Sequence, residues 1–380
     1  MNISGDWLHH PGTQGLCAAL DGAGYRALFV GGAVRNAILG LAVADIDLAT
    51  DARPETVVML AEQAGYRATP TGIAHGTVTV LARGRAHEVT TFRRDVETFG
   101  RRATVAFSQR VEDDAARRDF TMNALYATAV GDVLDPLGGL PDLLARRLRF
   151  VGDPAQRITE DYLRILRFFR FHAIYADPAG GMDADGLAAC ASHADGVDTL
   201  SKERVGAEMR KLLAAADPAP AMAAMAACGV LAYVLPGAQT AALAPLIHLE
   251  PPLAPDWLCR LAVLGGADPA HALRLSRADA RDLAVIHRGT ALSDGPAALG
   301  WRFGGRLAQA IVLNRAALTG GPLSGGWQAE VDRGIATPCP VCAADLMPGL
   351  HGAALGARLQ AVQARWLASD LRLSRAALLA

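Results

Sequence analysis

The chain has 380 residues, of which 51% are hydrophobic and 20% are charged, and its formal net charge at pH 7 is −1. This length allows two or more domains with sizeable cores, and the composition is typical of an ordered globular protein. No apolar run reaches the roughly 18 residues that cross a membrane, and the N-terminal stretch lacks the basic start and apolar core of a signal peptide. We therefore expect a cytoplasmic protein with no membrane partner.

A strand, a glycine pair and a helix are expected near the start of the chain. The apolar residues 28–30 predict a short buried strand, and residues 33–39 have the pattern of a short helix. Between them lie Gly31 and Gly32. Glycines at such a junction let a phosphate approach the backbone, and the helix start offers free N–H groups. Arg35, one turn into the helix, is able to add a charge-assisted hydrogen bond to a phosphate oxygen.

A second apolar run carries Asp45 and Asp47 on either side of Ile46. In a strand, alternate side chains share a face, so the two carboxylates would project together. Such hard oxygen ligands suit Mg²⁺, and a phosphate cradle beside a carboxylate pair is what two-metal nucleotidyl transfer needs. Either feature alone would more often be an ordinary turn or a solvated loop. Their occurrence together, in strand–glycine–helix–strand order, favours the catalytic interpretation.

Residues 77–81 and 87–92 are β-branched runs joined by a short turn, which predicts a β-hairpin. Glu88 on the second strand is either a third carboxylate facing the aspartate pair or an exposed strand glutamate. Residues 93–107 are polar and rich in arginine, and we expect them to form a mobile loop that folds over a substrate.

Arginine carries nearly all of the positive charge, since the chain has only two lysines. Nine arginines lie between residues 83 and 118. Arginine binds phosphate with a planar, bidentate geometry and stacks on bases, and a local basic region on a neutral protein indicates an anionic partner. A general preference for arginine would explain the missing lysines but not this clustering.

Two further helices are expected to carry functional side chains. Residues 112–126 have a helical pattern that includes Arg118 and Asp119, and residues 160–172 form an amphipathic helix. The polar half of the second helix carries four charged residues with phenylalanines interleaved: Asp161, Arg164, Arg167 and Arg170. This face is too apolar for open solvent and suits a cleft in which a flat polar ligand stacks. An aspartate acceptor beside an arginine donor matches the Watson–Crick edge of a base.

From about residue 176 the chain has helical periods and no strand pattern. The six cysteines are scattered, and only Cys339 and Cys342 have the spacing of metal ligands. A zinc site would need a second such pair, and none lies nearby. The chain is therefore expected to have an α+β fold in which the strands precede an all-helical remainder.

Five motifs occur in an order that is specific to one family. They are GGAVRN at 31–36, DID at 45–47, RRDFTMNA at 117–124, DPLGG at 135–139 and EDYLRILRFFRF at 160–171. With these motifs the sequence resembles the class II tRNA nucleotidyltransferase and poly(A) polymerase family, well over residues 25–235 and weakly to the end.

The resemblance implies a catalytic head with a small mixed sheet, followed by helical parts that hold tRNA. The implied boundaries are 1–150 for the head, 151–235 for the neck, 236–320 for the body and 321–380 for the tail. The implied activity is template-independent addition of CCA to the 3′ end of tRNA from CTP and ATP, with Mg²⁺ as the metal and no protein partner.

The resemblance also implies roles for individual residues. Asp45 and Asp47 would hold the metals, with Glu88 as a third carboxylate in the catalytic set. Gly31, Gly32 and Arg35 would line the triphosphate. The remaining nucleotide contacts would come from Arg118, from Asp119 near the ribose, from Asp161 and Arg164 at the base edge, and from Arg167 and Arg170, which complete the pocket.

One departure and three alternatives accompany this resemblance. The family commonly has aspartate where this chain has Asn36, which weakens any role for a charge there. A poly(A) polymerase shares the head, and a CC-adding or A-adding enzyme differs only in how far it extends the end. A non-catalytic RNA-binding protein would have lost a carboxylate of the metal pair, and both are present.

Overall fold

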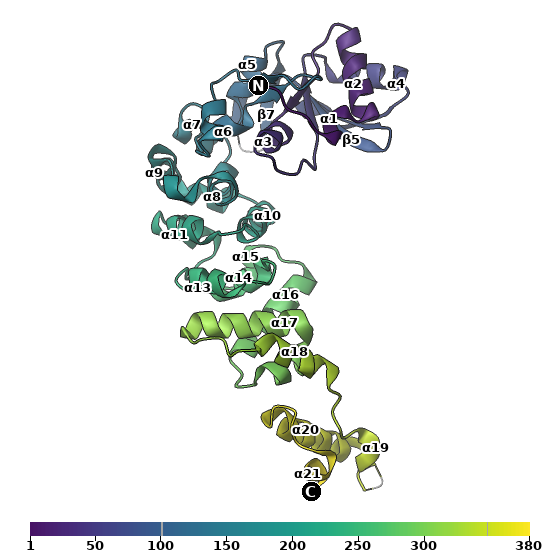
Figure 1. Cartoon of the computed structure of the whole chain (residues 1–380). Coiled ribbons are helices and arrows are strands. Elements are labelled where there is room, and N and C mark those ends of the chain that lie inside the picture. The colour runs from purple at the N-terminus through teal and green to yellow at the C-terminus, as the bar shows by residue number, and fades with distance from the viewer. Residues whose placement is uncertain (100–101, 348) are drawn as a thin grey trace. The chain divides into compact units, whose positions relative to one another are not determined.

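The structure of the protein is a computed structural model that describes residues 1–99, 102–347 and 349–380. The chain folds into two compact units (Figure 1). The first contains Met1–Leu200 and Cys228–Val230, and the second contains Ser201–Ala227 and Leu231–Ala380. Among the described helices, none has the length and apolar content needed to cross a membrane.

The first unit contains a seven-stranded sheet with the order β3-β4-β5-β2-β1-β8-β9. Its strands are β1 (Leu28–Val30), β2 (Asp47–Thr50), β3 (Arg67–Gly72), β4 (Thr77–Ala82), β5 (Arg85–Thr91), β8 (Tyr126–Ala127) and β9 (Val133–Leu134). The pair β2–β5 is parallel, and the other neighbours are antiparallel. The sheet is therefore mixed, and the expected α+β class and the hairpin β4–β5 are confirmed.

Short helices surround this sheet. They are α1 (Asp6–His9), α2 (Pro11–Gly22), α3 (Gly32–Ile38), α4 (Pro54–Gln63), the 3-10 turn η1 (Ile73–His75) and α6 (Leu140–Leu144). Helix α3 follows β1 directly, as expected, and Gly40 has a left-handed φ of 69° just beyond its end. Helices α2 and α4 pack on each other and on strands β4 and β5.

The expectation of a loop over residues 93–107 is wrong. These residues form a two-stranded antiparallel hairpin, β6 (Arg93–Phe99) and β7 (Arg102–Phe107), although residues 100 and 101 at its tip lie outside the described part. Both halves contain β-branched residues at strand-like spacing, such as Val96 and Thr98. This spacing favours strands, and the high arginine content obscured it.

Both long helices expected in the first unit are interrupted. Helix α5 covers only Val111–Ala116, and the chain then passes through an extended Phe120, which pairs with Phe150, to the 3-10 turn η2 (Thr121–Asn123). Arg118 and Asp119 therefore follow α5 instead of lying within a helix. Further on, α7 (Pro154–Glu160) and α8 (Leu163–Tyr175) are separate helices, because Asp161 is extended with φ −155° and ψ 106°.

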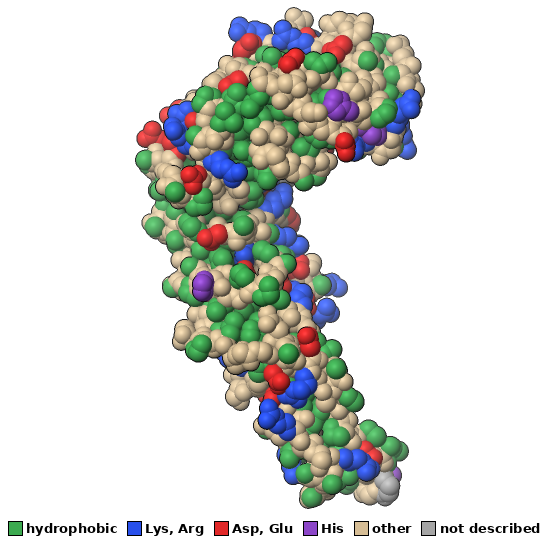
Figure 2. All heavy atoms as spheres, viewed as in Figure 1, with side chains coloured by type: hydrophobic (Ala, Val, Ile, Leu, Met, Phe, Trp, Pro, Cys, Tyr) green, Lys and Arg blue, Asp and Glu red, His purple; other side chains and the backbone are tan. Residues whose placement is uncertain are grey.

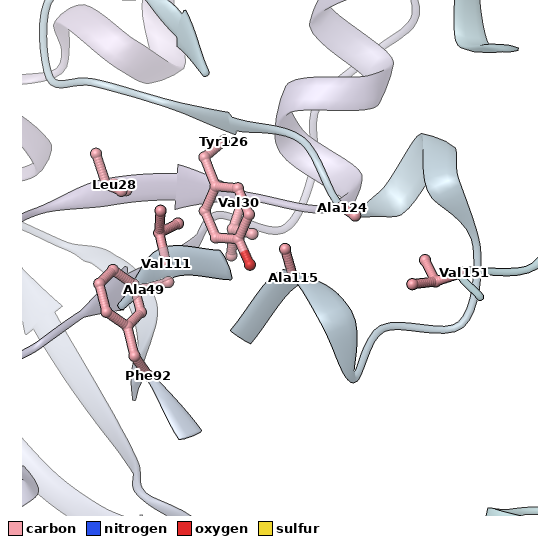
Figure 3. Packing of buried hydrophobic residues seen from close by; sticks show 9 residues of the cluster. All are labelled: Leu28, Val30, Ala49, Phe92, Val111, Ala115, Ala124, Tyr126 and Val151. Atoms are coloured by element: carbon pink, nitrogen blue, oxygen red, sulfur yellow. The ribbon is translucent and has the colours of Figure 1, made fainter. Parts of the chain in front are cut away.

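Two apolar clusters hold the first unit together. Figure 3 shows the first, to which β1, β2, α5 and β8 contribute Val30, Ala49, Ala115 and Tyr126 among others. The second is aromatic: Phe120 lies 5.0 Å from both Phe150 and Phe171, ring centroid to ring centroid, and Phe150 stacks on Phe168 at 5.4 Å. This aromatic cluster joins α8 to the segment that follows α5.

The rest of the described chain is helical. The elements are η3 (Pro178–Gly180), α9 (Ala184–Ser192), η4 (Ala194–Thr199), α10 (Lys202–Leu213), α11 (Ala219–Ala227), α12 (Val230–Val234), α13 (Leu243–Leu249), α14 (Trp257–Leu264), α15 (Pro269–Ala272), α16 (Arg277–Thr290), α17 (Pro296–Thr319), α18 (Trp327–Ala336), α19 (Ala343–Leu346), α20 (Gly352–Ala368) and α21 (Arg375–Leu379). On the visible face of this helical region, basic and acidic side chains are intermixed (Figure 2). The ion pairs of the described helical region include Arg210–Asp279 at 2.7 Å.

The C-terminal cysteines lie in different surroundings. Cys339 packs against the apolar cluster around Trp366, whereas Cys342 is exposed before α19. Within the described ranges, no group of three or more His, Cys, Asp or Glu side chains is arranged to hold a metal ion.

Removing the central ring of the aromatic cluster should destabilise the first unit. We expect Phe120→Ala to lower the free energy of unfolding by about 3–5 kcal/mol, because the ring is fully buried and leaves a cavity. The measurement is urea unfolding followed by fluorescence. Ile174→Ala in α8, at a side chain that is 37% exposed, is the control. An equal loss of unfolding free energy in both variants would contradict the assignment of Phe120 to the centre of the aromatic cluster.

Candidate active site

Three carboxylates lie close to the paired inner strands β2 and β5 of the mixed sheet. Asp47 is the first residue of β2 and lies opposite Glu88 of β5 in the parallel register. Asp45 precedes the strand and is exposed, so the expectation that both aspartates lie within one strand is wrong. All three side chains nevertheless line one cavity of about 550 Å³, together with Thr79 and Arg85.

The carboxylates of this cavity repel one another. Burial raises the pKa of the Asp47 carboxyl to about 6, and the nearby charges of Glu88 and Asp45 act in the same direction, while Arg118 opposes them. A bound cation would relieve this repulsion. The cavity offers hard oxygen donors but no complete ligand set, as is common for Mg²⁺, which protein carboxylates often share with substrate phosphates.

The turn between β1 and α3 lies between two guanidinium groups. Gly31 has φ 64°, a left-handed value that glycine adopts without strain. A Cβ atom on Gly31 would stand 3.3 Å from Nη1 of Arg118, and one on Gly32 would stand 3.7 Å from Nη2 of Arg35. The turn therefore combines an open backbone with nearby positive charge, which are the requirements of a phosphate site.

Arg118 is oriented by a buried carboxylate that the sequence analysis did not single out. Asp114 of α5 accepts hydrogen bonds from Arg118 at 2.9 Å, from Arg117 at 2.6 Å and from the hydroxyl of Tyr126 at 2.7 Å. Burial alone would favour the protonated acid, but the two guanidinium groups lower the pKa of Asp114 to about 2. The spacing of Asp114 to both arginines, i+3 and i+4, is the sequence signal that could have found it.

Asp119 holds a second group of polar side chains. Its Oδ1 accepts from Asn123 at 2.9 Å and its Oδ2 accepts from Nε of Arg167 at 2.7 Å. Burial again opposes ionisation, and the charge of Arg167 together with the hydrogen bonds lowers the pKa of Asp119 to about 2. The site therefore contains an ionised carboxylate that links η2 to α8.

The pair expected at the base edge lies at the junction of α7 and α8. Oδ1 of Asp161 accepts from the backbone N–H of Leu163 at 3.1 Å. The guanidinium of Arg164 pairs with Glu160 and donates to the backbone oxygen of Arg117 at 3.1 Å. Asp161 lies in the break between α7 and α8, and Arg164 lies in the first turn of α8, so the two side chains do not share one continuous helix face. Glu160 is a further member of the site.

The interleaved apolar residues of α8 do not line an open cleft, contrary to expectation. Phe168 and Phe171 are buried in the aromatic cluster. The guanidinium groups of Arg167 and Arg170 lie over the Phe171 ring, at 5.1 Å and 4.5 Å from its centroid. Both arginines therefore stack on a protein ring, and Arg167 is also held beside Asp119.

Two family models match the chain. The first, described as the poly A polymerase head domain, covers residues 27–149, and the second, described as a probable RNA and SrmB-binding site of polymerase A, covers residues 182–241. The CCA-adding enzyme of Geobacillus stearothermophilus is 34% identical over 340 residues, which are 85% of this chain and 81% of that protein. The chain belongs to the CCA-adding enzyme and poly(A) polymerase family.

Other members of the family give shorter matches or structural ones. Human mitochondrial CCA tRNA nucleotidyltransferase 1 is 42% identical over 184 residues, and this match spans 48% of the chain and 42% of that protein. The match to the CCA-adding enzyme of Anoxybacillus flavithermus likewise spans only about half of each protein. The solved CCA-adding enzyme of Bacillus stearothermophilus in complex with CTP has 29% identity and a TM-score of 0.71, covering 94% of this chain and 93% of that one. Nucleotidyltransferases of this kind generally use divalent metals.

The charge of Asp114 should make the stability of this family member sensitive to acid. Its folded pKa of about 2 lies below the ordinary 3.8, so the unfolded chain binds the proton first and stability is lost as the pH falls from about 4 to about 2. Asp114→Asn should cost about 3–5 kcal/mol at pH 7, because it removes the carboxylate partner of two partly buried arginines.

The same variant should differ less from the wild type near pH 2, where the wild-type carboxyl is about half protonated in the folded protein and almost fully protonated in the unfolded chain. Urea unfolding at both pH values measures this. Glu112→Gln, at a side chain in α5 that is 50% exposed, is the matched control. If Asp114→Asn lowers the free energy of unfolding by the same amount at both pH values, Asp114 is not ionised in its pairs with Arg117 and Arg118.

Proposed function

We propose that the chain adds CCA to the 3′ end of tRNA from CTP and ATP, without a nucleic-acid template, and releases pyrophosphate. The observation that carries this proposal is the Asp45, Asp47 and Glu88 cavity in a head that also has a glycine turn flanked by Arg118. The name of the Geobacillus stearothermophilus relative and the CTP complex of the solved relative support the same activity. The reaction would take place in the cytoplasm, which holds tRNA and both nucleotides.

We propose that Asp45 and Asp47 hold Mg²⁺, with Glu88 as the third carboxylate of the cavity. When bound, the metal would polarise the reacting phosphate and stabilise the charge on the attacking and leaving oxygens. The pKa of Asp47, raised to about 6 by burial and by the charges of Glu88 and Asp45, supports this assignment, because a bound cation would offset both effects.

The triphosphate would lie at the turn of Gly31 and Gly32. The backbone N–H groups at the start of α3 would face its oxygens, and Arg118 would neutralise part of its charge. In the reaction, the 3′ hydroxyl oxygen of tRNA bonds to the α-phosphorus and the bond to the pyrophosphate oxygen breaks. Holding both reactants in line supplies much of the rate.

The nucleoside would lie towards α8. Asp119, with Arg167 and Arg170, would border the ribose side, and Asp161 with Arg164 would read the base edge. For that reading, the Arg164 guanidinium must exchange its contact with Glu160 for one with the base. We further propose that residues 1–150 form the catalytic head and that the neck (151–235), body (236–320) and tail (321–380) hold tRNA.

The products of the reaction test this proposal. The chain is incubated with Mg²⁺ and tRNA that lacks its last three nucleotides, with CTP and ATP singly and together, and the products are sequenced. We expect growth by C, C and A that then stops. Termination at CC, or addition of A to a CC end alone, would mean a divided activity, and long A tails would establish the poly(A) polymerase named in the head-domain match.

Removing one metal-binding carboxylate should abolish addition. We expect Asp47→Asn to lower the rate by about 10³-fold, the scale of several kcal/mol of charge stabilisation, while tRNA binding in a filter assay persists. The melting temperature should not fall, since the variant removes a repelled charge. Glu55→Gln, at an exposed glutamate in the first turn of α4, is the control, and full activity of Asp47→Asn would rule out the metal assignment.

A further inference from the structure

A row of paired residues crosses the sheet at the level of the cavity that Asp45, Asp47 and Glu88 line. Asp47 of β2 pairs with Glu88 of β5, and Glu88 pairs in turn with Thr79 of β4. Thr79 also pairs with Thr69 of β3. Because directly opposed residues of antiparallel strands lie on one face of the sheet, Thr79 lies beside Glu88 on the next strand. It lines the same cavity of about 550 Å³.

The face of β4 and β5 that carries this row is accessible. Val78, Val80 and Val89 alternate with the row and are fully buried, and helices α2 and α4 pack on these two strands. In contrast, Glu88 is exposed and Thr79 is half-buried. This is the alternation expected of strands with one covered face, and the uncovered face next to the cavity is able to receive a substrate.

The strand order separates the two substrates of the proposed reaction. The order β4-β5-β2-β1 places β1, with the glycine turn that follows it, on one side of the carboxylates and β4 on the other. Arg35 and Arg118 lie beside the glycine turn, where the triphosphate is proposed to bind. In an in-line displacement the attacking oxygen lies opposite the leaving oxygen. The 3′ hydroxyl of the RNA would therefore approach the carboxylates from the side of β4.

The hydroxyl of Thr79 is oriented and has capacity for a further partner. It lies 2.8 Å from the hydroxyl of Thr71 in β3. A hydroxyl has one donor and two acceptor sites, so the bond to Thr71 leaves Thr79 able to bind another hydroxyl. In a ribose, the 2′ hydroxyl is next to the 3′ hydroxyl, and it is the group by which a protein distinguishes RNA from DNA.

We propose that Thr79, oriented by Thr71, binds the 2′ hydroxyl of the last nucleotide of the tRNA substrate. This inference rests on the proposed function and deepens it, because it assigns a specificity-determining contact to the RNA end. The contact makes the site selective for a ribose end over a deoxyribose end. It also turns the ribose so that the 3′ hydroxyl points towards the carboxylates.

Two forms of one substrate test this contact: tRNA that lacks its last three nucleotides and ends either in a ribose or in a 2′-deoxyribose. One hydrogen bond corresponds to about fivefold in an equilibrium. We therefore expect kcat/KM of the wild type for the first addition of C to be about fivefold higher with the ribose end. In Thr79→Val both ends should react equally, at the wild-type rate of the deoxyribose end. The KM for CTP should not change, since the nucleotide lies on the other side of the carboxylates.

Thr77→Val is the matched control. Thr77 is two residues before Thr79 on the same strand, and its hydroxyl lies 3.1 Å from that of Thr90. Thr90 pairs with Ala49, two residues along β2 from Asp47, so this second hydroxyl pair is further from the carboxylates. Thr77→Val should keep the wild-type preference for the ribose end. Thr79→Ser, which retains the hydroxyl, should keep it as well.

A purely structural Thr79 would give a different pattern. Thr79→Val would then slow both substrates by the same factor and keep the preference, and that result, or a wild type without preference, would overturn the contact. If Thr79→Val fails to fold, Thr71→Val, at an exposed residue, decides: the preference should fall, and an unchanged preference would overturn the proposal.

The same measurements separate this inference from the proposed function. A wild-type chain that adds neither C nor A to either substrate would overturn the proposed function and this contact with it. Normal addition of CCA at equal rates to both ends would overturn the contact alone.

Discussion

The ion pairs of Asp114 hold the segment that follows α5 in the first unit. The side chain of this carboxylate is 1% exposed, and it binds two guanidinium groups and the Tyr126 hydroxyl. A buried charge of this kind is tolerated only when its partners are complete. The chain leaves the helix after Ala116, and Arg117 and Arg118 remain paired with Asp114 at the i+3 and i+4 spacing. The extended segment that follows carries Asp119 to α8 and Phe120 into the aromatic cluster.

The sequence predicted those features that depend on neighbouring residues. The glycine turn after β1, the hairpin β4–β5 and the Asp153 cap of α7 could all be read from local patterns. The interruption at Phe120 could not, because its pairing with Phe150 overrode a continuous helical pattern. Phe168 and Phe171 were misread for the same reason: their partners, Phe120 and Phe150, come from another part of the chain.

The basic region illustrates how composition differs from function. Nine arginines lie between residues 83 and 118, yet several of them act within the protein. Arg117 and Arg118 pair with Asp114, and Arg93 donates to the backbone oxygen of His75. A cluster in the sequence therefore does not become one surface patch. Arg118 pairs with Asp114, and this contact also holds its guanidinium beside Gly31.

The parallel pairing of β2 with β5 has a consequence for the opposite side of the sheet. Glu88 lines one cavity with Asp45 and Asp47, while its neighbour His87 is fully buried and bonds to Thr13 of α2 at 2.9 Å. A slip of one residue would exchange the two faces, placing an imidazole among the carboxylates and a carboxylate in the core. The hydrogen bond between His87 and Thr13 thus ties β5 to α2 and favours the register in which Glu88, and not His87, lines the cavity.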